Sequence, residues 1–467
     1  MAGPVWTNPT SFLPNTLTMK INPTFAVLAL TLSPTISFAQ SATPTSAPIT
    51  ESNSRPLVSG PLSLQKAVEI ALVNSPILRG ATADLDIAAA RVKAAQAARK
   101  PSLSATTFLT TGSETGPIYN SPDGVTPQNL FAVPRGAFAD QNLMLMLPLL
   151  NGGRLQALTK QAQAARDASG FDLQTSRLDV ALDTKTAYRQ ALLALETQKV
   201  AAARQSATSE QLKNDRAAEK VGRVPGLFVL RDEAEDADAG QGVTNAARDV
   251  ELALISLRAL MGIQMESDFS LADSLETLGQ DPSAADIQTA LANRPELQSA
   301  RARLESARQG ENAVRGSSKF QAALTGMADL SGARSGSSGG LSVGVVVGVP
   351  IFDGGARRAG RDEARAQITR AQADVSRLEI QVEREVAGAR VSLDAARKNV
   401  VASQIALVAA QESYRVALLR YQGGRATNSE TLDGLAALTK ARTNRARALY
   451  EAQLASDQLA RAVGIAA

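Results

Sequence analysis

Apolar residues in the second half of the chain recur in alternating steps of three and four over an exceptionally long stretch. Such spacing is typical of a coiled-coil seam on one face of a helix. The pattern predicts a helix over 354–422, about 100 Å long at 1.5 Å per residue, and a return helix over 428–463. Apart from Ser403, which fills the one gap, the seam consists of Ile368, Ala371, Val375, Leu378, Val382, Val386, Ala389, Leu393, Ala396, Val400, Leu407, Ala410, Tyr414, Ala417 and Tyr421.

The first half of the chain has the same organisation. A long helix is predicted over 152–221, with Gly222 as its end, and a return helix over 226–261. A helix of a globular protein averages about three or four turns, so these segments are too long for a compact globule. Each half is therefore predicted to contain one very long helical hairpin.

Four shorter segments alternate apolar and polar residues, as β-strands with one apolar face do. Each is about ten residues long, which is the length of a tilted strand that crosses a bilayer. The alternation is looser in the first half than in the second. The predicted strands are 102–111, 138–147, 320–331 and 341–350.

The two strands of each half are joined by a segment rich in Gly, Ser and Pro. These segments predict hairpin loops at 112–136 and at "SGARSGSSGG" (331–340). Two hairpins cannot close a barrel within one chain, and no other sheet is predicted that could cover their apolar faces. The alternative, two ordinary hairpins of a soluble sheet, leaves those faces uncovered. We therefore expect the strands to find partners in other copies of the chain.

The second strand of each half leads into its long helix through one sequence pattern, "PLLNGGRLQA" at 148–157 and "PIFDGGARRA" at 350–359. Proline is expected to end strand pairing because it lacks the ladder donor. The two glycines allow the backbone to turn into the helix. The predicted strand-to-helix junction residues are Pro148, Gly152, Gly153, Pro350, Gly354 and Gly355.

These junctions belong to an internal repeat. A constant spacing of 202 positions (350 minus 148) relates them and extends to Gly222 and Gly424. Upstream, "ALVNSPIL" at 71–78 matches "ALANRPEL" at 290–297 with a spacing of 219 (290 minus 71). The predicted parts are repeat 1 (61–262), which begins with a short helix, a linker or equatorial segment (263–283), and repeat 2 (284–464).

The N-terminus is predicted to carry a targeting segment. Residues 1–39 are interpreted as a leader and signal peptide, with translation starting at Met19, an apolar stretch at Phe25–Leu32 and cleavage after Ala39. Residues 40–60, rich in Ser, Thr and Pro, are predicted to be a flexible lead-in. No later uncharged apolar run is long enough for a transmembrane helix. The mature protein is thus expected to be exported without a helical span.

The composition limits the chemistry. The 467 residues include no His and no Cys, which excludes Cys/His zinc sites, Ser-His-Asp triads, cysteine nucleophiles and disulfides. A hydrolase that uses carboxylates alone would need a compact cleft, and little chain is left outside the rods to build one. Acidic and basic residues are interleaved and the net charge is only +4, which is typical of solvated helix faces. We expect no enzyme activity, no cofactor, no metal site and no nucleic-acid partner.

Taken in this order and spacing, the motifs resemble those of TolC-type outer-membrane efflux proteins, from "SLQKAVEIALVNSP" at 63 to Gly464. The resemblance is carried by the Gly-Gly junctions, the N-x-P-x-L helix starts and the Y-x-x-G-R turn at 421–425. It implies a mixed fold in a homotrimer: four strands per chain form a twelve-stranded outer-membrane β-barrel, and a periplasmic α-helical barrel continues it as a tunnel.

The same resemblance implies a function in a Gram-negative cell. Such a protein is the passive outer-membrane duct of a tripartite efflux or type I secretion system and carries substrate from the periplasm to the exterior. Its partners would be two copies of itself, a periplasmic adaptor protein, an inner-membrane pump and outer-membrane lipid. The alternative is a periplasmic coiled-coil adaptor (membrane fusion) protein. Adaptors usually have one helical hairpin beside a lipoyl-like β domain, so the duplicated hairpin argues against this alternative.

In the resembling family, a tyrosine–arginine network and rings of acidic residues close the periplasmic end of the tunnel. The resemblance maps the tyrosine onto Tyr421 and the acidic positions onto Glu430 and Asp433, three copies of which would favour cations. The arginine falls on Ala426, with Arg425 one residue earlier, so the turn or the network must differ here. The candidate pore-constriction residues are Tyr421, Arg425, Glu430 and Asp433.

The first repeat has Phe228 and Arg231 opposite the two acidic positions, so an acidic ring would come from the second repeat alone. Without the resemblance, Glu430 and Asp433 are solvated acids near a helix N-terminus, where negative charge is favoured. The acidic run at 231–240 fits an exposed helix face better than a divalent-cation site.

Two further acids, Asp140 and Asp329, occupy polar positions of the predicted strands. There they would face a barrel lumen or lie at the membrane rim. Aromatic residues that would mark a membrane girdle are sparse, namely Phe108, Phe320 and Phe352.

Overall fold

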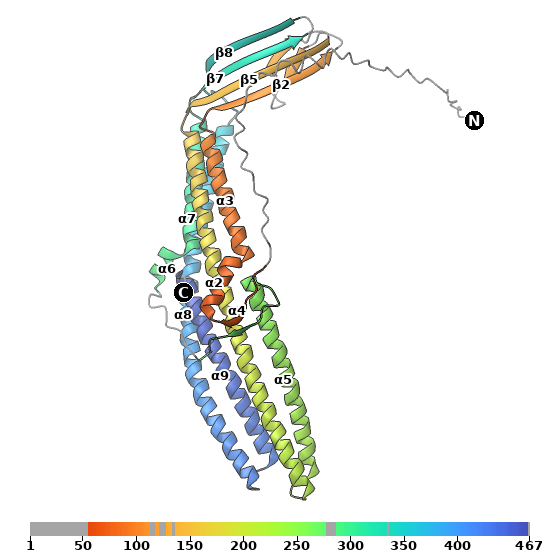
Figure 1. Ribbon diagram of the computed structural model, residues 1–467. Helices are drawn as coiled ribbons and strands as arrows, with labels where there is room; N and C mark the ends of the chain where they lie inside the picture. Colours follow the sequence, from red (N-terminus) through yellow and green to blue (C-terminus); the bar gives the residue numbers. More distant parts are fainter. Residues whose placement is uncertain are drawn as a thin grey trace, which may run out of the picture. The chain divides into compact units, whose positions relative to one another are not determined.

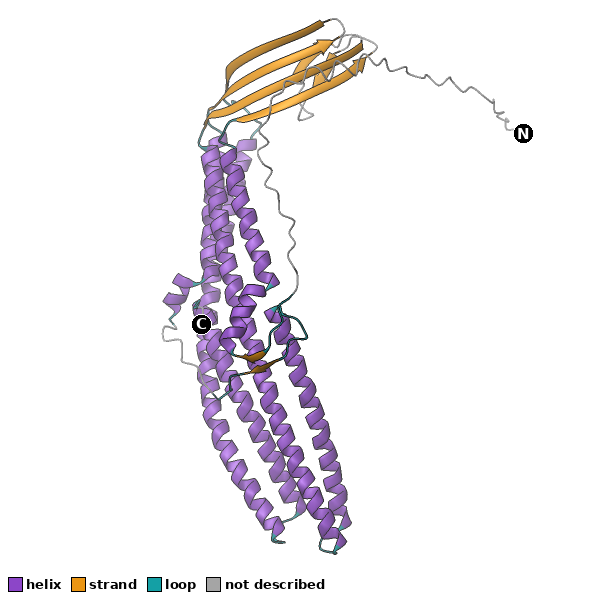
Figure 2. Cartoon of the chain, viewed as in Figure 1, coloured by secondary structure: helices purple, strands orange, loops and turns teal. Residues whose placement is uncertain are grey.

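The computed structural model describes residues 55–112, 117–120, 128–132, 136–276, 286–333 and 336–465, and they belong to one compact unit. The expected leader, the signal peptide and most of the lead-in lie outside these residues. Helix predominates in the described part (Figure 2). Its elements are β1 (Gly60–Leu62), α2 (Leu64–Asn74), α3 (Pro76–Ala97), β2 (Ser102–Gly112), β3 (Pro117–Asn120), β4 (Gln128–Ala132), β5 (Gly136–Asn151), α4 (Arg154–Lys220), α5 (Gly226–Met261), β6 (Phe269–Leu271), α6 (Ile287–Asn293), α7 (Pro295–Ser317), β7 (Gln321–Ala333), β8 (Gly336–Gly348), α8 (Ala356–Gln422) and α9 (Asn428–Val463).

Two helices of equal length, α4 and α8, form the rods with 67 residues each. Each is followed by a helix of 36 residues, α5 or α9, that packs back along it (Figure 1). Both rods begin two residues later than the predicted starts at 152 and 354. The preceding glycine pairs have left-handed backbones, with φ of 60° and 86° at Gly152 and Gly153, and 63° and 94° at Gly354 and Gly355. Glycine adopts such angles without a steric penalty.

The apolar seam predicted for α8 faces the other helices. Its positions from Ile368 to Tyr421 are all buried or half-buried, and Val382 and Val386 pack with Ala290 and Ala462. The opposite side of α8 carries a second apolar set that the single chain leaves exposed, Ile380, Val391, Val401, Ile405, Val408, Val416 and Leu419. Within the described ranges, no helix combines the length and apolar character that a membrane-spanning helix requires.

The four long strands form one antiparallel sheet in the order β2-β5-β7-β8, with β2 and β8 as its edges. Successive side chains of a strand point to opposite faces, so the register sorts the residues into two sets. One face is apolar and carries Leu103, Ala105, Leu143, Leu145, Leu147, Leu324, Ala328, Leu341, Val343, Val345 and Val347. The polar residues of the other face include Ser102, Ser104, Thr106, Asp140, Asn142, Thr325, Asp329 and Ser342.

The first strand-to-helix junction differs from the prediction. β8 ends at Gly348, before Pro350, but β5 runs through Pro148 to Asn151 and pairs Pro148 with Ala323. The expectation that proline ends the pairing therefore fails at this junction. The register shifts between Pro148 and Leu150, and such a bulge is one of the few places where a strand accommodates a proline.

The second hairpin loop is shorter than predicted, and the first contains a further pair of strands. In the second half, β7 extends to Ala333 and β8 starts at Gly336, so most of the Gly/Ser segment 331–340 is paired strand. β7 is itself paired to β5 as far as Ala333, so it offers β8 a template along that length. In the first half, the expected loop 112–136 contains β3 and β4, which pair with each other.

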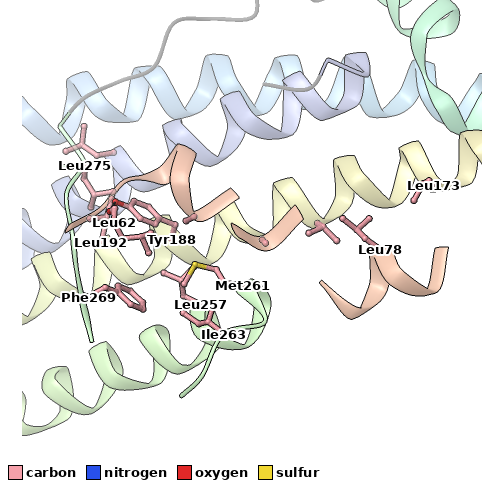
Figure 3. Close-up of a cluster of buried hydrophobic side chains, with 14 residues drawn as sticks. Leu62, Leu78, Leu173, Tyr188, Leu192, Leu257, Met261, Ile263, Phe269 and Leu275 are labelled. Carbon is pink, nitrogen blue, oxygen red and sulfur yellow. Dashed lines mark hydrogen bonds between the residues drawn. The ribbon is translucent and has the colours of Figure 1, made fainter. Parts of the chain in front are cut away.

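Short β1 pairs in parallel with β6, and both are anchored on the middle of α4 by Tyr188. The Tyr188 hydroxyl is fully buried and lies 2.7 Å from the Leu62 carbonyl oxygen and 2.8 Å from Asp273 Oδ2. Burial, with the neighbouring Asp273 carboxylate, raises the pKa of Tyr188, so the side chain stays a neutral donor. Around it lies a buried apolar cluster that includes Leu62, Leu192, Leu257, Met261, Ile263, Phe269 and Leu275 (Figure 3).

The end of the predicted lead-in is fixed by hydrogen bonds. The Gln264 backbone N–H donates to the Pro56 carbonyl (3.1 Å), and the Val58 N–H donates to Ser267 Oγ (3.2 Å). The expectation of a flexible lead-in through residue 60 is thus wrong for residues 55–60, because these backbone groups find partners on the segment that leads into β6.

Candidate functional site

The two helical hairpins are joined at their far ends by a buried hydrogen bond. The Tyr421 hydroxyl, at the end of α8, donates to Asp215 Oδ2 on α4 over 2.6 Å. The side chain of Asp215 is almost fully buried, with 3% of the residue exposed. The bond therefore connects the long helix of one half to the long helix of the other.

Asn428, the first residue of α9, extends this connection. Its side-chain amide donates to Asp215 Oδ2 (3.2 Å) and to Asp232 Oδ1 on α5 (2.8 Å). Gln211 Nε2, one turn before Asp215, donates to the same Oδ2 (3.0 Å). Helices α4, α5, α8 and α9 thus each contribute a side chain. We refer to Asp215, Asp232, Tyr421 and Asn428 as the tip cluster.

The tip cluster brings two carboxylates into one buried space. Burial, together with the adjacent Asp215 carboxylate, raises the pKa of Asp232 to about 7 against the opposing effects of Asn428 and Arg231. Burial and Asp215 also raise the pKa of Tyr421, so its hydroxyl remains a donor. Near neutral pH Asp232 therefore exchanges between its protonated and ionised forms beside Asp215.

The cluster exists because polar residues occupy helix positions that face the neighbouring helix. On α5 the buried positions begin Val229, Asp232, Ala239, and Asp232 takes the place of an apolar residue. On α4 the buried set near the tip includes Gln211 and Asp215. Buried polar groups require hydrogen-bond partners; Asp215 finds one on its own helix, Gln211, and two on the other hairpin, Tyr421 and Asn428, while Asp232 accepts from Asn428. The bonds of Tyr421 and Asn428 therefore tie the two hairpins together at this end.

Arg425 does not join the cluster. Its side chain is exposed and forms no hydrogen bond or ion pair within the part of the chain that is described. Its backbone carbonyl accepts from Arg420 Nη2 (3.3 Å), and its backbone N–H donates to the Arg420 carbonyl. Ala426, which stands where the family arginine was expected, is half-buried. The partner of Tyr421 is thus an aspartate on α4, and the tip cluster does not use Arg425.

Glu430 and Asp433 are both exposed on the first turns of α9. Thr427 caps this helix by accepting from the Glu430 N–H (3.2 Å), and the Thr427 hydroxyl lies 3.3 Å from Glu430 Oε1. Thr427 and Glu430 stand at the spacing of a capping box, and the contact of the Glu430 carboxylate with the Thr427 hydroxyl gives Glu430 a local role at the helix start. Asp433 forms no hydrogen bond or ion pair among the described residues, so its carboxylate is free to face solvent.

Sequence reasoning found Tyr421 but missed Asp215, Asp232 and Asn428. The signal that could have found them is a polar residue at a seam position, since Asp232 falls on the buried stripe of α5. The match of Asp215 to Tyr421 spans 206 positions (421 minus 215) and depends on how the two hairpins pack. No spacing within either helix encodes it.

The acidic run 231–240 is only partly an exposed face. Asp232 is buried in the tip cluster, Asp236 Oδ1 accepts from Thr208 (2.9 Å), and Glu233 pairs with Arg216 (2.8 Å) on α4. These acids bind α4, because α5 packs extensively along that helix. Among the described residues, no group of three acidic side chains is placed to hold a metal ion.

The chain was compared with known proteins. The family model "Outer membrane efflux protein" matches residues 67–263 and 287–465. The outer membrane efflux protein BepC of Brucella suis is 24% identical over 416 residues, 87% of each chain. Two solved structures share the fold: VceC of Vibrio cholerae (TM-score 0.72, 20% identity, 86% of this chain and 96% of that one) and the open state of MtrE of Neisseria gonorrhoeae (0.73, 21%, 86% and 89%).

Replacing Tyr421 with Phe should loosen the hairpin ends. The substitution removes one hydrogen bond to a buried charged group, which costs about 1–2 kcal/mol, so amide hydrogens at the start of α9 should exchange about five- to thirtyfold faster. The matched control is Tyr414→Phe on the same helix, because the Tyr414 hydroxyl has no hydrogen bond among the described residues. Equal protection in both variants would show that the Tyr421 bond does not hold the tip.

The contact between the hairpins should weaken as pH rises. The raised pKa of Asp232 means that the folded contact favours the protonated acid, so its stabilisation is complete below about pH 4 and is lost as pH passes about 7. Because the chain lacks cysteine, spin labels at Arg223 and Arg425 can report the distance between the two turns. The distance distribution should broaden between pH 6 and 8, and Asp232→Asn should abolish this change. A pH response that persists in Asp232→Asn would contradict the assignment.

Proposed function

The chain belongs to the outer membrane efflux protein family, and we propose that three copies form a closed ring, which is a passive duct through the outer membrane. The family makes the protein an outer membrane efflux channel, located in the outer membrane and extending into the periplasm, and not an enzyme. The TolC-type resemblance is thereby confirmed, and the adaptor alternative finds no support. The trimer, the twelve-stranded barrel and the passive mode of conduction are the proposal.

The observation that carries the proposal is the open edge of the sheet. β2 and β8 are each paired on one side only within the described residues, and the sheet has one apolar face. Unpaired backbone groups are not tolerated in the hydrocarbon of a membrane. β8 runs antiparallel to β2, so an edge-to-edge joint between two copies continues the antiparallel pattern. Three copies of a four-stranded sheet then give twelve strands, with the apolar face toward lipid.

The helices support the same closure. α4 packs extensively along α7 of the other half, whereas α8 has no extensive contact with α3 among the described residues. The spacings of 202 and 219 make α8 the counterpart of α4 and α3 the counterpart of α7. In a ring, the first part of α8 of one copy would therefore pack on α3 of the next. The equal lengths of α4 and α8, and of α5 and α9, support this equivalence.

This equivalence names one pair of residues. Within the chain, the space beside Gly310 on α7 is filled by Gln161 of α4, whose Nε2 would lie 3.1 Å from a β-carbon at Gly310. The corresponding positions are Arg91 on α3 and Glu363 on α8. Both are exposed in the single chain, and their opposite charges suit an intermolecular contact.

The proposal includes a closed resting state and partners that open it. The tip cluster ties the hairpins together at the end of the rods, and three clusters in a ring would hold that end shut. Opening then requires a partner that favours the separated hairpins. A periplasmic adaptor and an inner-membrane pump, which act in tripartite systems, are the partners we propose. The exposed Glu430 and Asp433 would add three carboxylates each around the entrance.

An engineered disulfide tests the ring. In the otherwise cysteine-free chain, Arg91→Cys together with Glu363→Cys should cross-link neighbouring copies, and complete oxidation should end at a covalent trimer on a denaturing gel. Each single-cysteine variant serves as the control and should yield at most a dimer. A ladder that continues beyond three copies, or no cross-linking of the double variant in outer membranes, would overturn the trimer.

Replacing Glu430 and Asp433 together with Ala should lower the preference for cations, because a ring of carboxylates attracts cations and repels anions. The reversal potential in a planar bilayer under a salt gradient measures this preference. The matched control is Glu266→Ala with Asp268→Ala, which removes two exposed acids between α5 and β6, far from the tip. Identical reversal potentials in all three proteins would contradict a role for Glu430 and Asp433 at the entrance.

A further inference from the structure

Three methionines lie together on the polar face of the sheet. Met144 of β5 is directly opposite Met327 of β7, and Met146 follows two positions along β5 on the same face. Directly opposed residues in an antiparallel pair have β-carbons about 4.5–5.5 Å apart. Residues two apart on a strand are separated by about 7 Å. The three flexible side chains can therefore bring their sulfur atoms to one point.

The neighbours of these methionines are polar. The row that crosses the sheet through Met144 and Met327 has Ser104 on β2 and Ser342 on β8 at its ends. Met146 faces Thr325. All three methionines are exposed in the chain, with 43%, 46% and 37% of Met144, Met146 and Met327 accessible. Their thioethers are thus open to whatever occupies the space in front of this face.

The distribution of methionine over the two faces is uneven. The described residues contain five methionines, and these three are the ones on the long strands. The apolar face consists of Leu, Val and Ala with scattered Gly, Thr and Gln, although methionine would suit lipid as well as leucine does. If the thioethers served only as apolar filling, the lipid-facing side would be the natural place for them. Their position on the polar face indicates a use for the sulfur atoms.

Thioether sulfur is a soft ligand. Methionine side chains select soft ions such as Cu(I), whereas carboxylates and carbonyls suit Mg²⁺, Ca²⁺ and Mn²⁺. Two acids on the same face add a long-range attraction for any cation. Asp329 lies one row from Met327, and Asp140, held by Asn142 Nδ2 (2.7 Å), lies two rows from Met144. The face thus combines an attraction for positive charge with a local preference for a soft ion.

We propose that Met144, Met146 and Met327 form a binding site for a soft monovalent cation, Cu(I) or Ag(I), on the inner wall of the duct. The position on an inner wall rests on the proposed barrel, in which the polar face lines the lumen. Each closed ring would carry three such sites at one level. A site of this kind holds a passing soft ion by thioether ligation and releases it without any redox step.

Silver is the suitable probe because Ag(I) needs no reductant. The protein is purified as the full assembly in detergent, in chloride-free nitrate buffer, with methionine labelled by ¹³C at the methyl group. Addition of AgNO₃ should shift the methyl signals of Met144, Met146 and Met327 together. Met265 is an internal control, because it is 40% exposed but lies between α5 and β6, outside the sheet that carries the three methionines. Its signal should move only at much higher silver concentration.

Substitution separates thioether ligation from apolar contact. Met144→Leu with Met327→Leu keeps the volume and apolar character of the two side chains. Loss of a residue that only supports a metal ligand weakens metal binding by about 10- to 100-fold. Loss of two ligands should weaken silver binding by at least that factor. Met265→Leu should leave binding unchanged. Parallel shifts of all exposed methionines, or silver binding retained in the double variant, would overturn the site. If silver binds as expected but the Arg91/Glu363 cross-link fails, the methionine site is supported and the proposed trimeric duct is contradicted.

Discussion

Unpaired backbone groups along β2 and β8 set the condition that the rest of the architecture meets. The inner strands β5 and β7 are satisfied on both sides, but each edge strand presents a row of donors and acceptors that lipid cannot bind. The sheet also has one apolar face, and the β7–β8 register that helps to create it continues without a shift from Gln321 to Ala333. On the proposed ring, closing the edges orders the strands and brings the starts of the long helices, which follow directly from β5 and β8, around one axis.

The long helices are held together by two kinds of contact, apolar along most of their length and polar near the tip. Along most of α8 the contact with its neighbours is made by Ala, Val and Leu at regular spacing, which packs closely but has little specificity. Near the tip the seam positions become polar, and the same packing then brings Asp215 and Asp232 together. Apolar contacts are insensitive to protonation, whereas this contact depends on where one proton resides. The packing along the hairpins is thus independent of pH, whereas the contact between their ends depends on the protonation of Asp232.

Much of this organisation could be predicted from the sequence because it is periodic. The seam of α8 and the alternation of β7 and β8 are local patterns, and the order of motifs identified the family. The failures occurred where a residue's state depends on distant partners. Pro148 remains in a strand because β7 continues beside it, and residues 55–60 are ordered because the segment before β6 binds them. Asp232 looked like one of several surface acids until the packing of α5 on α4 and α9 buried it.

The anchoring of β1 and β6 on Tyr188 has a mechanical meaning. It fixes α4 near its middle, 27 residues before Asp215 (215 minus 188). From Tyr188 the helix extends about 40 Å to Asp215, so a tilt of about 10° at that level would carry Asp215 through about 7 Å. A displacement of that size exceeds the reach of every hydrogen bond in the tip cluster. A small rotation of α4 at the level of Tyr188 would therefore suffice to separate the residues of the tip cluster.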